Sequence, residues 1–446
     1  MVTVLFPSTL RPLVGDASEI EAAGATALEA LRGLEREHPR LAGWVLDEQG
    51  RLRQHVSLFV NDEQADLERP VGPGDRLHIV PAISGGMGPD AAALILVGTR
   101  KGLFVLEGER GGRLNVAARR FAGQTVEYAL RDPGTGRVFA SVTHGQFGPH
   151  LFFTDDPLAP EGEWQQAQGP AFPEDAGAAV QRIWVVEPGE GGVLWAGVAP
   201  AALFRSDDGG RTWSLNRGLW DLPGRPAWQG GVGGLCLHSI CPWPGKPERL
   251  AIGISSAGVW RTEDGGATWS WGVEGLVPRY VPEEARATTT AFCVHNLHRA
   301  PLQPETLYMQ FHGGVYRSDD AGATWTDIAA GLPCDFGFPI VLDPRDPDRA
   351  YVIPLVADVD RVTPDGKLRV YETRDRGRSW QALTRGLPQD GCWATILRQA
   401  FCHDGGDPLG LYFGTEAGEL WSSADGGATW TLAADRLPPI VSVRAG

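Results

Sequence analysis

The sequence predicts a multi-domain protein with a small α+β domain at residues 1–86 and a larger all-β domain at residues 92–446. Three observations lead to this prediction. A chain of 446 residues is longer than one ordinary hydrophobic core can organise. The hydrophobic pattern changes near residue 87, and a nine-residue word built on Asp, Gly and Trp recurs only after that point.

The composition argues against several kinds of partner. A formal net charge of −15 with no basic run disfavours binding to nucleic acid or to an anionic membrane surface. The N-terminus lacks the features of a secretory signal, and no stretch approaches the roughly 20 apolar residues of a membrane span. Six cysteines without a C-x-x-C pair fit a reducing compartment. We therefore expect a cytoplasmic protein without nucleic-acid or membrane partners, and we assign it no cofactor and no metal.

The first domain is predicted to run strand, helix, strand, strand. Residues 2–6 form a short apolar strand, and Thr26 with Glu29 forms a capping box that opens a helix ending before Pro39. Residues 55–62 and 75–82 form two further strands. The last of them leads directly into two adjacent glycines.

This order, together with the words FPSTLRP, HVSLFVNDE and DRLHIVPAISGG, resembles the ubiquitin-like β-grasp fold of the MoaD/ThiS sulfur carriers, and most closely the carrier of cysteine biosynthesis. In that family an E1-like activating enzyme adenylates the C-terminal carboxylate, which then becomes a thiocarboxylate. The resemblance therefore implies that Gly85 and Gly86 form a carrier tail, because residues without a Cβ can thread a narrow active site.

The tail of this chain departs from the family pattern, because Gly86 is joined to Met87 by a peptide bond. The resemblance then implies cleavage after Gly86, with a JAMM-type metallopeptidase as the expected agent and a sulfur-accepting enzyme as a further partner. Residues 87–91 are expected to link the two domains. The alternative to a carrier tail is that Gly85 and Gly86 simply open this flexible linker.

The recurring word predicts the fold of the second domain. Its five copies resemble the Asp-box, or BNR, repeat of sialidase-like β-propellers, and residues 153–164 are a degenerate sixth copy. The resemblance implies that the box aspartates are turn residues without a catalytic role: Asp208, Asp264, Asp320, Asp375 and Asp425.

The number of outer hairpins predicts the number of blades. Hairpins begin near Leu94, Val138, Leu194, Leu250, Leu307, Ala350 and Leu411. The first has no inner strand ahead of it, and the chain end IVSVRAG can supply one. We therefore expect a seven-bladed propeller at residues 92–446 that is closed by its C-terminal strand.

Candidate functional side chains come from the predicted inner strands. Counting back from the proline that ends each strand places four polar residues at one register: Glu127, Arg182, His238 and His295. Cys236 and Cys293 precede the two histidines by two residues, so each Cys/His pair faces one side of its strand. We expect these catalytic candidates to meet in one polar pocket. They could also bind zinc or copper, form a thiolate–imidazolium pair that accepts sulfur, or simply fill the core.

Three functions stay open at this point. We favour sulfur transfer, with the propeller as a docking or sulfur-processing partner of the carrier. The alternatives are a glycoside hydrolase-like or other small-molecule enzyme, and a protein-binding scaffold. Sialidase chemistry is disfavoured, because residues 181–184 read QRIW in place of the F/Y-R-I-P word, and neither Tyr128 nor Tyr280 has assignable Glu and Arg partners. The residues alone do not decide whether the protein is an enzyme.

Overall fold

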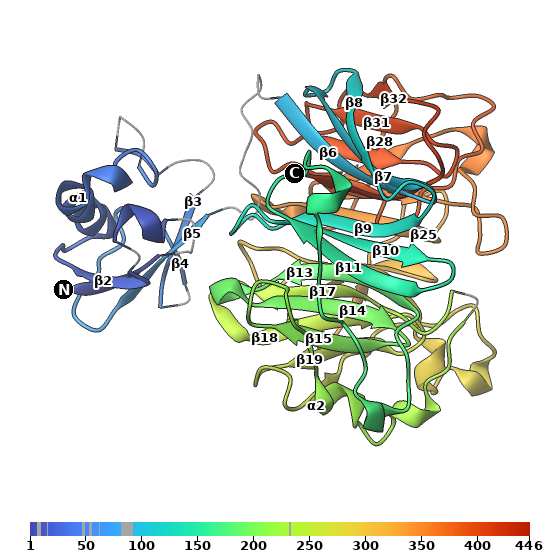
Figure 1. Cartoon of the computed structure of the whole chain (residues 1–446), viewed down its shortest axis with the longest axis horizontal. Helices are drawn as coiled ribbons and strands as arrows, with labels where there is room; N and C mark the ends of the chain where they lie inside the picture. The colour runs from blue at the N-terminus through green and yellow to red at the C-terminus, as the bar shows by residue number, and fades with distance from the viewer. Residues whose placement is uncertain are drawn as a thin grey trace.

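The computed structural model describes residues 1–6, 10–15, 17–46, 50–52, 56–61, 63–81, 92–231 and 233–446. Figure 1 shows a small N-terminal domain and a larger domain built of β-sheets. The predicted boundary between the domains, at residues 86–91, lies outside the described residues. The first strand of the larger domain begins at Ala92. The described part of the chain contains no helix long and apolar enough to cross a membrane.

The described residues of the N-terminal domain form a five-stranded mixed sheet with one long helix. The sheet order is β2-β1-β5-β3-β4, in which β1 and β5 are parallel and the other neighbours are antiparallel. Its elements are β1 (Val2–Leu5), β2 (Glu19–Ala22), α1 (Ala27–Glu37), β3 (Val56–Val60), β4 (Glu63–Ala65) and β5 (Arg76–Pro81). Apolar residues on one face of α1, including Leu31 and Leu34, pack into the same core as Val4, Leu58 and Leu77.

The predicted capping box begins helix α1. The Glu29 backbone N–H donates to Oγ1 of Thr26 at 3.3 Å, and the Ala25 N–H donates to the Glu29 carboxylate at 2.8 Å. The predicted order of elements omitted β2 and β4. Both strands are short, and three of the four residues of β2 are not buried, so neither gives a strong hydrophobic signal.

The larger domain contains seven four-stranded antiparallel sheets among its described residues. Six of them follow chain order, as β9–β12, β13–β16, β17–β20, β21–β24, β25–β28 and β29–β32. The seventh combines β33 with β6, β7 and β8.

The strands of the larger domain have the following bounds: β6 (Ala92–Thr99), β7 (Gly102–Glu109), β8 (Leu114–Arg120), β9 (Thr125–Arg131), β10 (Val138–His144), β11 (Gly148–Thr154), β12 (Gln165–Gln166), β13 (Arg182–Pro188), β14 (Leu194–Ala199), β15 (Ala202–Ser206), β16 (Ser214–Leu215), β17 (Leu237–Trp243), β18 (Lys246–Ile254), β19 (Gly258–Thr262), β20 (Ser270–Trp271), β21 (Val294–Arg299), β22 (Leu307–Phe311), β23 (Gly314–Ser318), β24 (Thr326–Asp327), β25 (Gly337–Asp343), β26 (Asp346–Pro354), β27 (Val370–Thr373), β28 (Gln381–Leu383), β29 (Phe401–His403), β30 (Leu411–Gly414), β31 (Leu420–Ser423), β32 (Thr431–Ala434) and β33 (Ile440–Ala445). A one-turn helix, α2 (Arg217–Trp220), follows β16.

Strand β33 supplies the innermost strand of the first sheet. It pairs antiparallel with β6, and the register places Ile440 opposite Thr99 and Arg444 opposite Leu96. The sequence predicts this pairing, because the first hairpin has no inner strand ahead of it and the C-terminal segment can supply one. Without β33, strand β6 would leave an unpaired edge.

A buried ion pair joins this first sheet to the sheet of β29–β32. Arg110 lies in the turn between β7 and β8, and its Nε and Nη2 atoms donate to the two carboxylate oxygens of Asp404 at 2.6 and 3.1 Å. Both side chains are fully buried. Burial alone would raise the pKa of Asp404, but the bonds from Arg110 and from the Gly406 and Gly410 N–H groups lower this pKa overall.

The Asp boxes form tight turns between the third and fourth strands of their sheets. In the second box, Oδ1 of Asp264 accepts bonds from the Thr268 N–H at 2.9 Å and from the Thr262 hydroxyl at 2.8 Å. The Thr268 hydroxyl donates to Oδ2 at 2.6 Å, and these bonds lower the pKa of Asp264 to about 2. The same bonds to the residue four positions later recur at the other boxes, at Asp208, Asp320, Asp375 and Asp425.

Candidate functional site

The innermost strands of all seven sheets line one cavity of about 630 Å³. Each sheet contributes a lining side chain from its first strand: Tyr128 of β9, Glu187 of β13, Cys241 of β17, His298 of β21, Val341 of β25, Phe401 of β29 and Arg444 of β33. The innermost strands of the seven sheets therefore meet at this one cavity.

Polar groups in the cavity have strongly shifted pKa values. Burial raises the pKa of Glu187 to about 8, although Arg444 partly opposes this, and burial lowers the pKa of His298 to about 3. Burial also raises the pKa of the Cys241 and Cys402 thiols to about 12. These four groups are therefore mostly neutral at pH 7, so none of them provides a thiolate nucleophile or a charged general base.

Arg444 has a fixed position in the cavity wall. Its Nε donates to the Tyr128 hydroxyl at 3.2 Å, and its Nη1 donates to the backbone oxygens of Val443 and Gln399 at 2.7 and 2.9 Å. The guanidinium also lies over the Tyr128 ring, 4.7 Å from the centroid. Arg444 therefore gives the cavity a cation that neighbouring groups hold in one orientation.

Gln399 lines the cavity, and Arg398 directly precedes it in the chain. The Gln399 amide donates to the backbone oxygen of His238 at 2.9 Å, and Nε of Arg398 donates to the backbone oxygen of His295 at 3.1 Å. The Asn296 amide donates in return to the Arg398 carbonyl at 2.8 Å. A segment that leads into β29 is thus tied to β17 and β21.

A β-bulge occurs at the same level of several innermost strands. The pairing registers skip one residue each in β9, β13, β17, β21 and β33, and β25 has a wider interruption at this level. The skipped residues are Glu127, Trp184, His238, His295 and Val441. Bulges redirect side chains and are frequent beside active sites.

The bulges correct one part of the predicted alignment. Arg182 was expected at the same register as Glu127, His238 and His295, but Arg182 is the first residue of β13, and Trp184 occupies the bulge. Arg182 nevertheless lies close by. It forms an ion pair with Glu127 at 3.2 Å and covers the Trp184 ring at 4.7 Å. Burial raises the pKa of Glu127, although Arg182 and Arg100 partly oppose this shift.

The two candidate histidines tie neighbouring sheets together. His238 and His295 contact backbone oxygens of the next innermost strand, Nε2 of His238 at 2.9 Å from the Val294 oxygen and Nδ1 of His295 at 2.6 Å from the Gly337 oxygen. Burial lowers both imidazole pKa values, and Arg398 adds to this effect. Of the four predicted polar residues, His238 lines the cavity, whereas Glu127, Arg182 and His295 are not among its described lining residues.

The candidate cysteines are thiols. Cys236 is buried and its Sγ lies 3.2 Å from the Gly233 oxygen. Burial raises the pKa of Cys236 and of Cys293, although Arg398 partly opposes both shifts. Because the thiols favour the protonated form and the imidazoles favour the neutral form, the thiolate–imidazolium pair does not form here at neutral pH.

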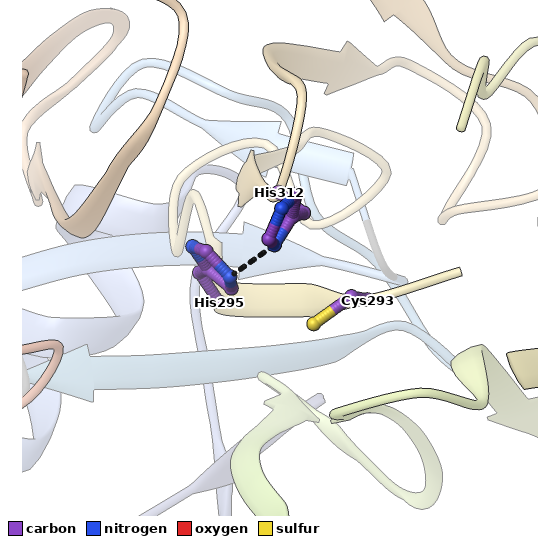
Figure 2. A group of neighbouring side chains, drawn as sticks. All are labelled: Cys293, His295 and His312. Atoms are coloured by element: carbon purple, nitrogen blue, oxygen red, sulfur yellow. Dashed lines mark hydrogen bonds between the residues drawn. The ribbon is translucent and has the colours of Figure 1, made fainter. Parts of the chain in front are cut away.

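Cys293, His295 and His312 form a compact cluster (Figure 2). One potential ligand atom from each residue lies within 4.8 Å of the others. Nδ1 of His312 is 3.3 Å from Nε2 of His295, as the dashed line in Figure 2 marks. His312 directly follows β22, in the turn that leads to β23.

The sequence pattern did not reveal the cavity residues Glu187, Arg444 and Gln399, or Arg398 next to Gln399 in the chain. Glu187 directly precedes Pro188, the proline that ends its strand. Considering the residues an odd number of positions before that proline, and not only those an even number before it, would have found Glu187. Arg398 and Gln399 lie in a stretch without a strand pattern, and their positions depend on contacts with distant strands.

Comparisons with known proteins match the two domains separately. Residues 4–86 match the model of the ThiS family, and residues 204–215 match the BNR/Asp-box repeat. Small archaeal modifier protein 1 of Haloferax volcanii is 37% identical over 62 residues, which cover 14% of this chain and 71% of that protein.

The larger domain is similar to parts of longer proteins. An oligoxyloglucan-reducing end-specific xyloglucanase of Emericella nidulans is 24% identical over 255 residues, which cover 49% of this chain and 29% of that enzyme. The chain thus spans less than a third of that enzyme's length. The crystal structure of an ancestral GH74 enzyme aligns with a TM-score of 0.46 at 15% identity, over 79% of this chain and 40% of that one.

Proposed function

The chain belongs to the ThiS family through its N-terminal domain, and from this premise we propose that the protein is a sulfur carrier activated as a thiocarboxylate at Gly86. One observation carries the proposal. The family match covers residues 4–86 and therefore ends at the second glycine of the Gly85-Gly86 pair. The five-stranded sheet supports it, because β5 lies between β1 and β3 and ends at Pro81, five residues before that glycine.

Activation requires a free carboxylate at Gly86. Hydrolysis of the Gly86–Met87 bond consumes one water and leaves the carboxylate of Gly86 and the amine of Met87. The carboxylate attacks the α-phosphate of ATP on an E1-like enzyme and releases pyrophosphate, and a sulfide donor then displaces AMP to give the thiocarboxylate. A JAMM-type metallopeptidase is the proposed agent of the first step. The presence of ATP and the activating enzyme makes the cytoplasm the proposed location.

The larger domain would act as the docking partner of the carrier. We interpret its seven sheets as the blades of a propeller that β33 closes, because all seven contribute innermost strands to one axial cavity. Such a ring presents loops from every blade on two faces, which suits binding to a sulfur-accepting enzyme.

Mass spectrometry tests the carrier proposal. The full chain is incubated with the metallopeptidase, the activating enzyme, ATP and sulfide, beside an authentic carrier as a positive control. We expect a fragment that ends at Gly86 and is heavier by the mass difference between sulfur and oxygen. A Gly86→Ala variant should lose this product, whereas the matched Gly88→Ala variant, which lies beyond the cut, should retain it. Recovery of intact chain alone, while the control carrier is thiolated, would overturn the proposal.

A second candidate function is hydrolysis of a glycan, which the similarity to the xyloglucanase favours. Glycosidases usually need two carboxyl groups beside the bond that breaks. The described cavity lining includes Glu187 and Asp404, but Asp404 is engaged by Arg110, two backbone N–H groups and Tyr412. This leaves Glu187 as one available carboxyl group, which weakens the hydrolase candidate. Release of reducing ends from xyloglucan, lost in a Glu187→Gln variant, would establish it instead.

A further inference from the structure

Backbone pairing holds the Cys293, His295 and His312 cluster in place. Cys293 and His295 lie on either side of the first residue of β21, and His312 directly follows β22, the strand that pairs with β21. The His312 N–H donates to the Cys293 carbonyl at 3.0 Å, which fixes these two residues opposite each other. The three side chains are therefore brought together by the sheet and not by a flexible loop alone.

A backbone acceptor orients the His295 imidazole ring for coordination. The Gly337 carbonyl oxygen can only accept, so Nδ1 of His295 carries the proton, and the lone pair of Nε2 faces His312. The other ring nitrogen of His312, Nε2, lies 3.9 Å from Oδ2 of the Asp358 carboxylate. A histidine that donates one N–H to a carbonyl or carboxylate and offers its other nitrogen to a metal is a common second-shell arrangement.

The separation of the two facing nitrogens suits a metal ion. Nitrogens 3.3 Å apart, each about 2.0 Å from an ion, would subtend an angle of about 110° at that ion. Sγ of Cys293 and one ring nitrogen of each histidine lie within 4.8 Å of one another, so the sulfur is near enough to serve as a third ligand. Thiolate and imidazole together select copper or zinc.

The charge of Arg398 decides between these metals. Its Nε donates to the His295 carbonyl oxygen at 3.1 Å, which places the guanidinium beside the cluster. A monovalent ion with one thiolate and two neutral imidazoles forms a group of zero net charge, whereas a divalent ion leaves a positive group beside the guanidinium. Aromatic rings also lie beside the cluster, and the centroid of the Phe336 ring is within 5.3 Å of the centroids of both histidine rings. Because these surroundings are apolar, they favour the uncharged complex.

We propose that Cys293, His295 and His312 bind one monovalent copper ion. The thiol of Cys293 loses its proton to solvent as the sulfur–copper bond forms, and the oxidation state of copper does not change. The ion reaches the site past His312, whose side chain is 23% exposed. This inference stands independently of the sulfur-carrier proposal, because it involves none of the residues of the tail.

Anaerobic titration of the full-length protein with Cu(I), against a coloured Cu(I) chelator, tests the proposal. The wild-type chain should remove one equivalent of copper from the chelator. Cys293→Ser and His312→Gln should each weaken binding at least tenfold. Cys236→Ser is the matched control. The buried Cys236 directly precedes β17, as Cys293 directly precedes β21, but it lies outside the cluster. The Cys236→Ser variant should therefore bind Cu(I) as the wild type does.

Two further measurements keep the result decisive. X-ray absorption of the loaded protein should show one sulfur and two nitrogen neighbours around copper. Near-ultraviolet circular dichroism identifies any variant that fails to fold. The His312→Gln variant, whose side chain is partly exposed, then decides the test. Wild-type affinity in both cluster variants would overturn the site, and zinc binding that competes equally with Cu(I) would overturn the charge argument that selects copper.

Discussion

Replacing Arg110 with methionine should destabilise the larger domain strongly. Methionine keeps the apolar stem of the side chain but removes the guanidinium that neutralises the buried Asp404 carboxylate. Breaking a buried ion pair by removing one partner costs roughly 3–5 kcal/mol. Asp404 would keep the Gly406 and Gly410 N–H groups and the Tyr412 hydroxyl as donors. We therefore expect a loss of about 3 kcal/mol, at the lower end of that range.

Urea unfolding followed by tryptophan fluorescence measures this loss, because all but one of the 16 tryptophans lie in residues 92–446. Arg113→Met is the matched control. Arg113 lies near Arg110 in the chain and pairs with Asp435 at 3.4 Å, but its side chain is 62% exposed, so its removal should cost less than about 0.5 kcal/mol.

Acid adds a second readout for the same pair. Because the folded-state pKa of Asp404 is lowered, its stabilising contribution is present above the unfolded-state pKa and is lost as the pH falls through the folded-state value. The stability difference between wild type and Arg110→Met should therefore shrink in acid. Equal urea midpoints for the Arg110 and Arg113 variants at pH 7 would refute the reasoning.

Three more predictions concern other parts of the molecule. The pKa of Glu187 is about 8 in the folded state and near 4.5 in the unfolded state. The free energy of unfolding should therefore fall as the pH rises from 4.5 to 8, by up to about 1.4 kcal/mol per pH unit. Glu187→Gln should flatten this slope in urea titrations, and an unchanged slope would contradict the shift. Thr26→Ala should cost helix α1 about 1 kcal/mol, measurable as faster amide exchange in its first turn. Asp264→Ala should lower the melting temperature more than its neighbour Glu263→Ala, because only Asp264 accepts the bonds of the Asp-box turn; equal shifts would show that those bonds contribute little.

Much of the fold could be predicted because its signals are local and repeated. The Asp boxes mark the turns between the third and fourth strands, and the hairpin starts at Val138, Leu194, Leu307 and Leu411 coincide with observed strand starts. The capping box of Thr26 and Glu29 is equally local. Strands β2 and β4 were missed because short strands with few buried residues leave no such pattern.

The candidate site could be predicted only in part, because bulges and crossings depend on tertiary structure. An extra residue in five of the innermost strands reverses the faces of the strand beyond it, and counting from the terminal proline placed Arg182 at the level where Trp184 lies. Trp393, which precedes the sheet of β29–β32 in the chain, is 65% exposed. The strand of its sheet begins only at Phe401, after Arg398 and Gln399 have crossed to contact β17 and β21.

The pairing of β33 with β6 also determines when the larger domain can finish folding during synthesis. The paired residues Thr99 and Ile440 are more than 340 positions apart, and a ribosome adding about 5–20 residues per second needs roughly 20 to 70 seconds to make the intervening chain. The N-terminal domain, whose last described strand ends at Pro81, has emerged complete long before then. During this interval the nascent chain carries a finished small domain, followed by an incomplete larger domain in which the β6 edge is unpaired. The proposed peptidase, acting after Gly86, could therefore release the small domain while the rest of the chain is still being translated.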